Sequence, residues 1–212
     1  MRLRLRAAAG GFIIAFQAGQ QKPQVQIILP ERTELATAAP MVRSAALLTD
    51  GAMRNLLVNG FPARLHYRME RWAKGGWFDD IKATSEWDVV VKYDALSKRY
   101  HVFRAVKNRA QELGSYDNLN DAEAMVDAPF QAPIAPAKRG QRSYYNLVLD
   151  IETLSLTELD EVEQWLRGEM KPAVRGKKNP GTAVSRGVRT LVVRLLGGEK
   201  LRYEARSGTF RP

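Results

Sequence analysis

The middle of the chain alternates hydrophobic and polar side chains with a period of two. Leu65, Tyr67 and Met69 are apolar, and the positions between them are charged or polar. The alternation covers three stretches: residues 63–72, 84–94 and 99–106. Period two places successive side chains on opposite faces of a strand, and the short turn-forming links favour antiparallel pairing. We therefore expect an antiparallel meander with one buried face and one face in water.

Further elements are expected on both sides of this meander. The patterns predict strands at residues 25–30, 41–48, 111–116, 143–154 and 200–210. They predict helices at residues 49–60, 118–129, 157–170 and 182–198. Thr49 or Asp50 is expected to cap the first helix, and Gly60 is expected to end it before Pro62. The sequence thus predicts a mainly β fold, an antiparallel β-sandwich or a strongly bent sheet with three or four short helices in the connections.

The N-terminus has the pattern of a secretory signal. Three arginines within the first six residues precede an uncharged, largely apolar stretch at residues 7–16. Cleavage stays open because Phe16 stands where a small residue is preferred, and the alternative is an ordinary buried or frayed segment. We expect residues 1–19 to be a signal peptide or N-terminal apolar segment and the chain to be extracytoplasmic, in the periplasm or cell envelope. A strand and linker at 20–40 and a single β-rich domain at 41–212, with a basic helical section at 157–198, complete the predicted organisation.

The positive charge is concentrated near the C-terminus. The net charge of the 212 residues is +10, and residues 171–206 hold ten Lys and Arg against two acids. Such a section predicts an acidic protein partner or an anionic membrane surface. The candidate anion-binding residues are Arg175, Lys177, Lys178, Thr182, Arg186 and Arg189. The alternative is a solvated basic loop that binds nothing.

A nucleotide site in this section is not expected. Gly176 and Gly181 have the separation of a phosphate loop, but Thr182 follows Gly181 directly and the required lysine is missing. Thr182 is better interpreted as a helix cap, where free backbone amides attract a plain anion.

The residue types for several chemistries are lacking or sparse. The chain has no cysteine, which excludes disulfides and thiolate sites. His66 and His101, expected on neighbouring strands of the meander, are too few for a stable metal site. Serine nucleophile motifs are also missing. The sequence therefore predicts no enzyme activity, no metal and no cofactor.

Carboxylates at alternate strand positions leave one hydrolytic hypothesis open. Asp150 and Glu152 share a strand face, as do Glu86 and Asp88, at a spacing of about 6.5–7 Å that acid–base pairs can use. The solvent-facing side of an antiparallel strand is normally polar, and this interpretation is preferred.

Aromatic residues gather at the turn after the first meander strand. Trp77 and Phe78 are expected to cap one end of the core, with Trp72 close by. The alternative is a stacking platform for single-stranded nucleic acid, because the preceding strand is rich in arginine. Export disfavours nucleic acid as a partner.

Four segments together resemble a known bacterial family. They are NGFPARLHYRMERW, EWDVVVKYDALSKRYHV, SYDNLNDAEAMV and YYNLVLDIETL, and the hairpin carries Tyr93-Asp94 before its turn and Arg99-Tyr100 after it. The chain is similar, over residues 41–211, to the domain of unknown function 4390 family of uncharacterised exported proteins. The resemblance implies an extracytoplasmic location and carries over no catalytic residues. The basic section has no counterpart that we can match in that family.

These observations predict an exported, non-enzymatic β-rich domain that acts as a binding or structural module at the bacterial cell envelope. A basic C-terminal face would hold its anionic partner. The alternatives are a cytoplasmic nucleic-acid-binding β-domain and, third, a carboxylate-dependent hydrolase. The oligomeric state stays open.

Overall fold

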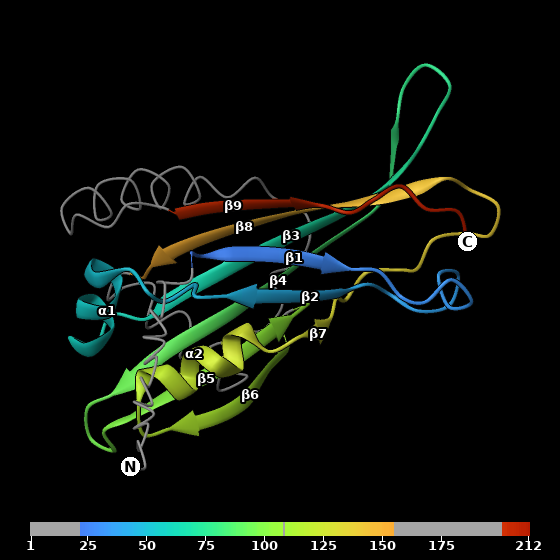
Figure 1. The fold of residues 1–212 in the computed structure, drawn as a ribbon. Helices are drawn as coiled ribbons and strands as arrows, with labels where there is room; N and C mark the ends of the chain where they lie inside the picture. The colour runs from blue at the N-terminus through green and yellow to red at the C-terminus, as the bar shows by residue number, and fades with distance from the viewer. Residues whose placement is uncertain (1–21, 108, 155–200) are drawn as a thin grey trace, which may run out of the picture.

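Two antiparallel β-sheets and two short helices make up the part of the chain that the structure describes, residues 22–107, 109–154 and 201–212 (Figure 1). The structure is a computed structural model. The smaller sheet has the order β1-β2-β7, with β1 at Gln24–Ile28, β2 at Met41–Ala45 and β7 at Phe130–Gln131. The larger sheet has the order β6-β5-β4-β3-β8-β9. Its strands are β3 (Ala63–Ala73), β4 (Asp80–Asp94), β5 (Arg99–Val106), β6 (Arg109–Tyr116), β8 (Ser143–Thr153) and β9 (Leu201–Arg206). The predicted mainly β, antiparallel fold is confirmed.

The buried face of the meander is the one that its alternation predicts. Leu65, Tyr67 and Met69 of β3 are fully buried. The Tyr67 ring stacks on Trp87 of β4 with 5.2 Å between centroids, and Phe130 of β7 meets both rings edge-on. Because Phe130 belongs to the smaller sheet, this aromatic cluster joins the two sheets. Burial of the Tyr67 hydroxyl raises its pKa to about 12.

Both described helices begin at the capping residues that their sequences supply. Helix α1 (Gly51–Val58) begins after Asp50, whose carboxylate accepts a hydrogen bond from the Met53 amide at 2.8 Å. Helix α2 (Leu119–Asp127) begins after Asn118, which accepts from the Asp121 amide at 2.9 Å. Gly60 follows α1 with a φ of 87°, as expected of a terminating glycine. Neither helix is long and apolar enough to cross a membrane.

Two further predicted helices, at 157–170 and 182–198, lie outside the described residues. So do the apolar N-terminal stretch at 7–16 and most of the basic section.

The β3–β4 hairpin extends past the rest of the larger sheet. Strand β5 pairs only with residues 87–94 of β4, so residues 80–86 of β4 have β3 as their one partner strand among the described residues. The link 74–79 forms the tip of a hairpin that projects from the body of the molecule (Figure 1). Trp77 and Phe78 are 96% and 84% exposed at this tip. The expectation that they cap the core is therefore wrong, because the hairpin carries them beyond the strands and loops that enclose the core.

Candidate functional site

The hairpin tip is the six-residue link 74–79, which is closed by hydrogen bonds to Asp79. The Gly75 amide donates a hydrogen bond to Asp79 Oδ1 at 3.2 Å, and Asp79 Oδ2 accepts one from the Tyr144 hydroxyl of β8 at 3.0 Å. A Cβ atom at position 75 would overlap the carbonyl oxygen of Phe78, so this approach requires glycine. Partial desolvation raises the pKa of Asp79, but the bonds from Tyr144 and Gly75 and the nearby Lys74 charge outweigh it and lower the pKa.

Aromatic stacking fixes the base of the hairpin on the outer face of the larger sheet. Trp72 of β3 stacks on Tyr144 with centroids 6.1 Å apart, and the Arg206 guanidinium of β9 lies 3.9 Å from the centre of the Tyr144 ring. The Lys74 amide donates to the Arg142 carbonyl at 2.8 Å, which joins the hairpin to the loop before β8. The base of the hairpin is thus attached to β8 and to the loop before it.

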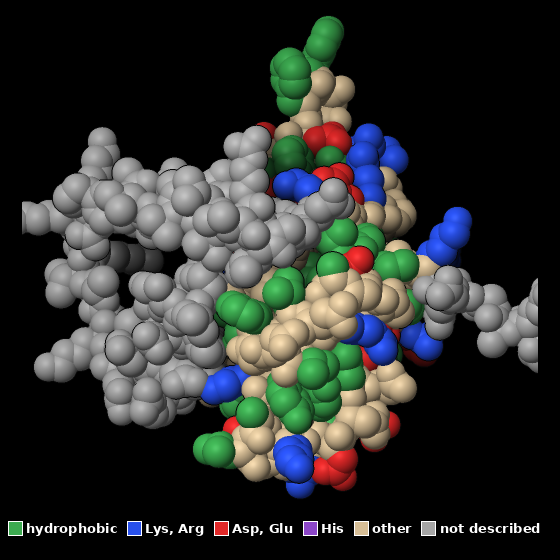
Figure 2. All heavy atoms as spheres, turned by 90° about the vertical axis from the view of Figure 1, so that its left-hand side faces the viewer, with side chains coloured by type: hydrophobic (Ala, Val, Ile, Leu, Met, Phe, Trp, Pro, Cys, Tyr) green, Lys and Arg blue, Asp and Glu red, His purple; other side chains and the backbone are tan. Residues whose placement is uncertain are grey.

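The apex carries apolar surface that the described part of the chain does not cover. Trp77 and Phe78 stand at the end, and Ile81 behind them is 47% exposed. Figure 2 shows hydrophobic side chains at the end of the projection at the top of the molecule. Soluble proteins scatter single exposed apolar residues, but two adjacent aromatic rings on a protruding turn indicate a contact surface.

A group of cations, which we call the basic collar, lies on the loop bonded to the hairpin base and at the chain end beside that loop. Its members are Lys138, Arg139, Arg142 and Arg211, all exposed. The loop that bears the first three is bonded to the hairpin through the Arg142 carbonyl and to the chain end through Gly140, whose amide donates to the Pro212 carbonyl at 3.0 Å. None of the four forms an ion pair with a residue that the structure describes.

The acids of the tip do not cancel this charge. Asp79 lies 3.8 Å from the Lys74 ammonium, and Asp80 lies 3.4 Å from the Lys82 ammonium. Each tip acid therefore has a tip lysine beside it, and the tip itself is close to neutral. The positive charge of the collar is not neutralised by these acids. This end of the described structure is therefore apolar at its apex and positive at its base.

The strand carboxylates of the hydrolytic hypothesis lie among cations. Asp88 of β4 accepts from Arg64 Nε at 2.8 Å and Nη2 at 3.1 Å and pairs with His66 Nδ1 at 2.8 Å. Burial raises the pKa of Asp88, but the His66 and Arg64 hydrogen bonds and charges lower it overall. A general acid needs the opposite shift, so the pKa of Asp88 does not support that role.

The other three carboxylates have the same kind of neighbour. Glu152 lies 3.3 Å from Arg64, Glu86 lies 3.8 Å from Arg68, and Asp150 lies 3.9 Å from Arg202. A groove of about 690 Å³ over β3, β4, β8 and β9 is lined by both signs of charge. These contacts fit the interpretation that the acids belong to a charged outer face of the sheet.

The two histidines do not meet. They lie on β3 and β5, and the prediction that these strands are neighbours is wrong because β4 lies between them. His66 bonds to Asp88, and His101 Nδ1 bonds to Glu112 Oε1 at 2.7 Å. Within the described ranges, no group of three or more His, Asp or Glu side chains is arranged to hold a metal ion.

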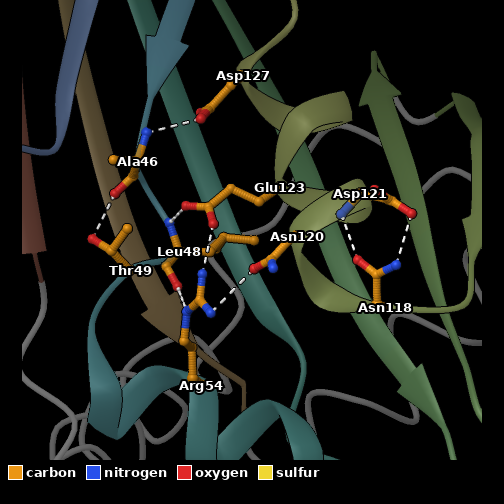
Figure 3. Close-up of polar contacts among 9 residues, drawn as sticks. All are labelled: Ala46, Leu48, Thr49, Arg54, Asn118, Asn120, Asp121, Glu123 and Asp127. Atoms are coloured by element: carbon orange, nitrogen blue, oxygen red, sulfur yellow. Dashed lines mark hydrogen bonds and ion pairs between the residues drawn. The ribbon is translucent and has the colours of Figure 1, made fainter. Parts of the chain in front are cut away.

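At the other end of the molecule, two acids of α2 bind the link between β2 and α1 (Figure 3). Glu123 Oε1 accepts from the Leu48 amide at 2.9 Å, and Oε2 accepts from Arg54 Nη2 at 2.7 Å. Asp127 Oδ2 accepts from the Ala46 amide at 2.8 Å. Burial raises the pKa of Asp127 to about 6. A cavity of about 650 Å³ beside these acids is lined by both of them.

Sequence reasoning gave these two acids no role, although their spacing carries a signal. Glu123 and Asp127 are four residues apart, which places both carboxylates on one face of a helix. A polar stripe beside buried Ala122 and Val126 indicates that this face meets another segment and not open water.

The predicted anion-binding residues, Arg175, Lys177, Lys178, Thr182, Arg186 and Arg189, lie outside the described residues, and their anion site stays a prediction. The basic collar and the aromatic apex were not predicted as a site. Comparison with family models, with curated proteins and with solved structures found no significant match. The resemblance to the domain of unknown function 4390 family therefore stays a prediction, and the function is argued from the geometry.

Proposed function

We propose that this chain is a non-enzymatic, exported binding module of the bacterial cell envelope that uses its hairpin end to hold an anionic partner. The signal-like N-terminus and the family resemblance support the location. The net charge of +10 supports a partner of opposite sign. The basic section at 171–206 would add to the same attraction.

The observation that carries this proposal is that the hairpin end exposes two aromatic rings together with cations that have no ion-pair partner among the described residues. Exposed Trp77 and Phe78 stand above four exposed cations that no described acid pairs. Exposed aromatic rings are unfavourable in water and gain free energy when a partner covers them, and the cations gain free energy when an anionic surface pairs with them. The contacts at the hairpin base keep the apex and the cations together in the free protein, which would lower the entropic cost of binding.

Fractionation of cells that express the tagged full chain tests this proposal. We expect the wild-type chain in the envelope fraction and a Trp77→Ser/Phe78→Ser double variant to be released in part to the soluble fraction. Leu96→Ser is the matched control, because Leu96 is 95% exposed at the other end of β4. Loss of envelope association should be confined to the hairpin variant.

Two outcomes contradict the proposal. Recovery of the wild-type chain in the cytosol removes the predicted location. Equal envelope association of the hairpin variant and the Leu96→Ser control removes the hairpin end as the binding surface. Thermal unfolding of each purified variant is the control for correct folding, and both variants are expected to unfold cooperatively.

The exposed aromatic pair also favours a second candidate function, single-stranded nucleic-acid binding in the cytoplasm. Bases stack on exposed rings flanked by cations, and Trp77 and Phe78 with the collar have both elements. Titration of salt against binding to single-stranded DNA tests it, because phosphate contacts impose a steep negative dependence of affinity on salt. A slope near zero, or the same affinity for the Trp77→Ser/Phe78→Ser variant, contradicts this candidate.

A further inference from the structure

We propose that the partner of the hairpin end is an anionic phospholipid bilayer, with Trp77 and Phe78 inserted at the headgroup level and the basic collar against the lipid phosphates. This inference rests on the proposed function and names the partner of the same surface. An acidic protein is the other partner class, and the test below separates the two.

The shape of the apex favours a bilayer over a protein. Specific protein interfaces bury about 800 Å² on each partner and require a complementary surface. The apex offers two adjacent aromatic side chains on a two-stranded projection, with Ile81 behind them. A bilayer needs no preformed pocket, because its lipids rearrange around a small inserted wedge. A narrow apolar apex is therefore better matched to lipid than to a folded partner.

The residue types at the apex suit the boundary between lipid and water. Tryptophan is enriched at this boundary, because its ring is apolar and its indole N–H still reaches water or headgroups. The backbone of the turn keeps access to water at headgroup depth, so its polar groups carry no penalty of the kind that the hydrocarbon core imposes. The Gly75–Asp79 bond and the Tyr144 bond hold the turn in shape without help from the lipid.

The cations stand where phosphates would lie once the apex is inserted. Lys138, Arg139 and Arg142 lie on the loop bonded to the hairpin base, behind the apex, and Arg211 lies beside that loop at the chain end. Each Lys or Arg near an anionic leaflet strengthens binding by about fivefold. The pairing of Asp79 and Asp80 with tip lysines removes the repulsion that two free carboxylates would bring to an anionic surface. Apolar insertion and charge thus act together, and anchoring usually needs such a combination of two signals.

Cosedimentation of the purified full chain with lipid vesicles tests the inference. The probe is a vesicle of equal parts phosphatidylglycerol and phosphatidylcholine, compared with a vesicle of phosphatidylcholine alone. We expect binding to the anionic vesicle and at least about tenfold weaker binding to the neutral one. Comparison of the two lipids alone would not separate the hairpin from the basic section at 171–206, so paired variants of the full chain are needed.

In each pair, the same type of substitution is made once at the hairpin end and once at a distant exposed position. Trp77→Ser/Phe78→Ser is expected to weaken binding to the anionic vesicle about tenfold or more, whereas Leu96→Ser leaves it unchanged. Lys138→Gln/Arg139→Gln is expected to weaken it about tenfold. Arg43→Gln/Lys98→Gln removes the same charge from exposed positions on β2 and in the β4–β5 turn, and it should have at most a small effect.

Tryptophan fluorescence reports insertion directly. Trp77 is almost fully exposed, so its emission should shift to shorter wavelength when the anionic vesicle is added. Trp77→Phe keeps an aromatic ring at the apex and removes one of the four tryptophans, so its difference from the wild type reports on position 77. This variant should still sediment with the vesicle but should lose the wavelength shift.

Three results would overturn the lipid inference. The first is a wild-type chain that does not sediment with anionic vesicles, and the second is a hairpin variant that sediments as well as the wild type. The third is an unchanged Trp77 emission in the bound state. If the wild type ignores vesicles while the hairpin variant still loses envelope association in cells, the partner is a protein and the proposed function stands. If neither assay depends on the hairpin, both proposals are wrong.

Discussion

The two ends of the long β3 strand use their charged side chains in opposite ways. At the α1 end, Glu123 and Asp127 bind backbone amides of the β2–α1 link, and Arg54 pairs with Glu123 at 2.7 Å (Figure 3). At the hairpin end, four exposed cations have no described ion-pair partner, and two aromatic rings stand in water. One end uses these charged groups in bonds within the fold, and the other leaves charge and apolar area available.

This difference separates residues that stabilise the fold from residues that are free to bind. Removing a buried, bonded carboxylate leaves its partners unsatisfied, which costs stability. Removing an exposed ring at the apex leaves nothing unsatisfied, so only binding should change. The contrast between the two ends predicts that the free energy of unfolding changes most for substitutions at bonded positions and least for substitutions of the exposed rings.

Glu123→Ala should produce the largest loss, about 2–4 kcal/mol in the free energy of unfolding, because it removes the partner of the Leu48 amide and of Arg54 together. Urea unfolding measures it. Glu123→Gln keeps an acceptor for the amide and should lose less. A loss below about 0.5 kcal/mol for the alanine variant would show that the link is held by other contacts.

Gly75→Ala should destabilise the hairpin by about 1–2 kcal/mol, because the new Cβ would overlap the Phe78 carbonyl and force the turn to shift. Gly76→Ala is the matched control, since a Cβ there meets no atom within 4 Å. Thermal unfolding and limited proteolysis of the tip compare the two. Equal behaviour of the two variants would contradict the close approach at position 75.

Asp127 should make stability depend on pH in a direction unusual for a carboxylate. Its folded pKa of about 6 lies above the ordinary value of 3.8, so the folded state favours the protonated form. Its contribution to stability is therefore fully present below pH about 4 and is lost as pH rises from about 4 to about 6. The total loss is about 1–2 kcal/mol in the free energy of unfolding, after allowance for solvent screening. Asp127→Asn removes this contribution. The difference in unfolding free energy between variant and wild type should change across that window, and a constant difference would contradict the raised pKa.

Trp77→Ser/Phe78→Ser should have the smallest effect, within about 0.5 kcal/mol of the wild-type free energy of unfolding, because neither ring is buried. Urea unfolding again provides the measurement. A loss of more than about 1 kcal/mol would mean that the rings support the fold, and the contrast between the two ends would fail.

The meander and the helix caps were predictable because their causes are local. Leu65, Tyr67 and Met69 alternate with polar positions, and a one-residue shift would turn all three into water. Asp50 marks the start of α1 and Gly60 marks its end, and both act through short-range backbone geometry that these residue types indicate. Such features do not depend on where distant strands end.

The hairpin end was not predictable, because its exposure depends on the lengths of other strands. The sequence favoured a cap on the core for Trp77 and Phe78, with a stacking platform for nucleic acid as the alternative. What decides between them is that β5 stops opposite Trp87, so the outer part of β4 continues without it. The collar depends likewise on the loop before β8 and the chain end meeting the hairpin base. The separation of His66 from His101, by contrast, follows from the predicted meander itself, because they lie on its first and third strands and β4 is the second.

Photo-cross-linking in intact cells tests the hairpin end as the binding surface most directly. A photoreactive phenylalanine analogue replaces Trp77 in one full-length variant and Leu96 in another, two highly exposed positions at opposite ends of β4. We predict that position 77 yields adducts with an envelope component, lipid or protein, and that position 96 yields few or none. Adducts from position 96 alone, or equal adducts from both, would contradict the proposal that the hairpin end is where this protein binds its partner.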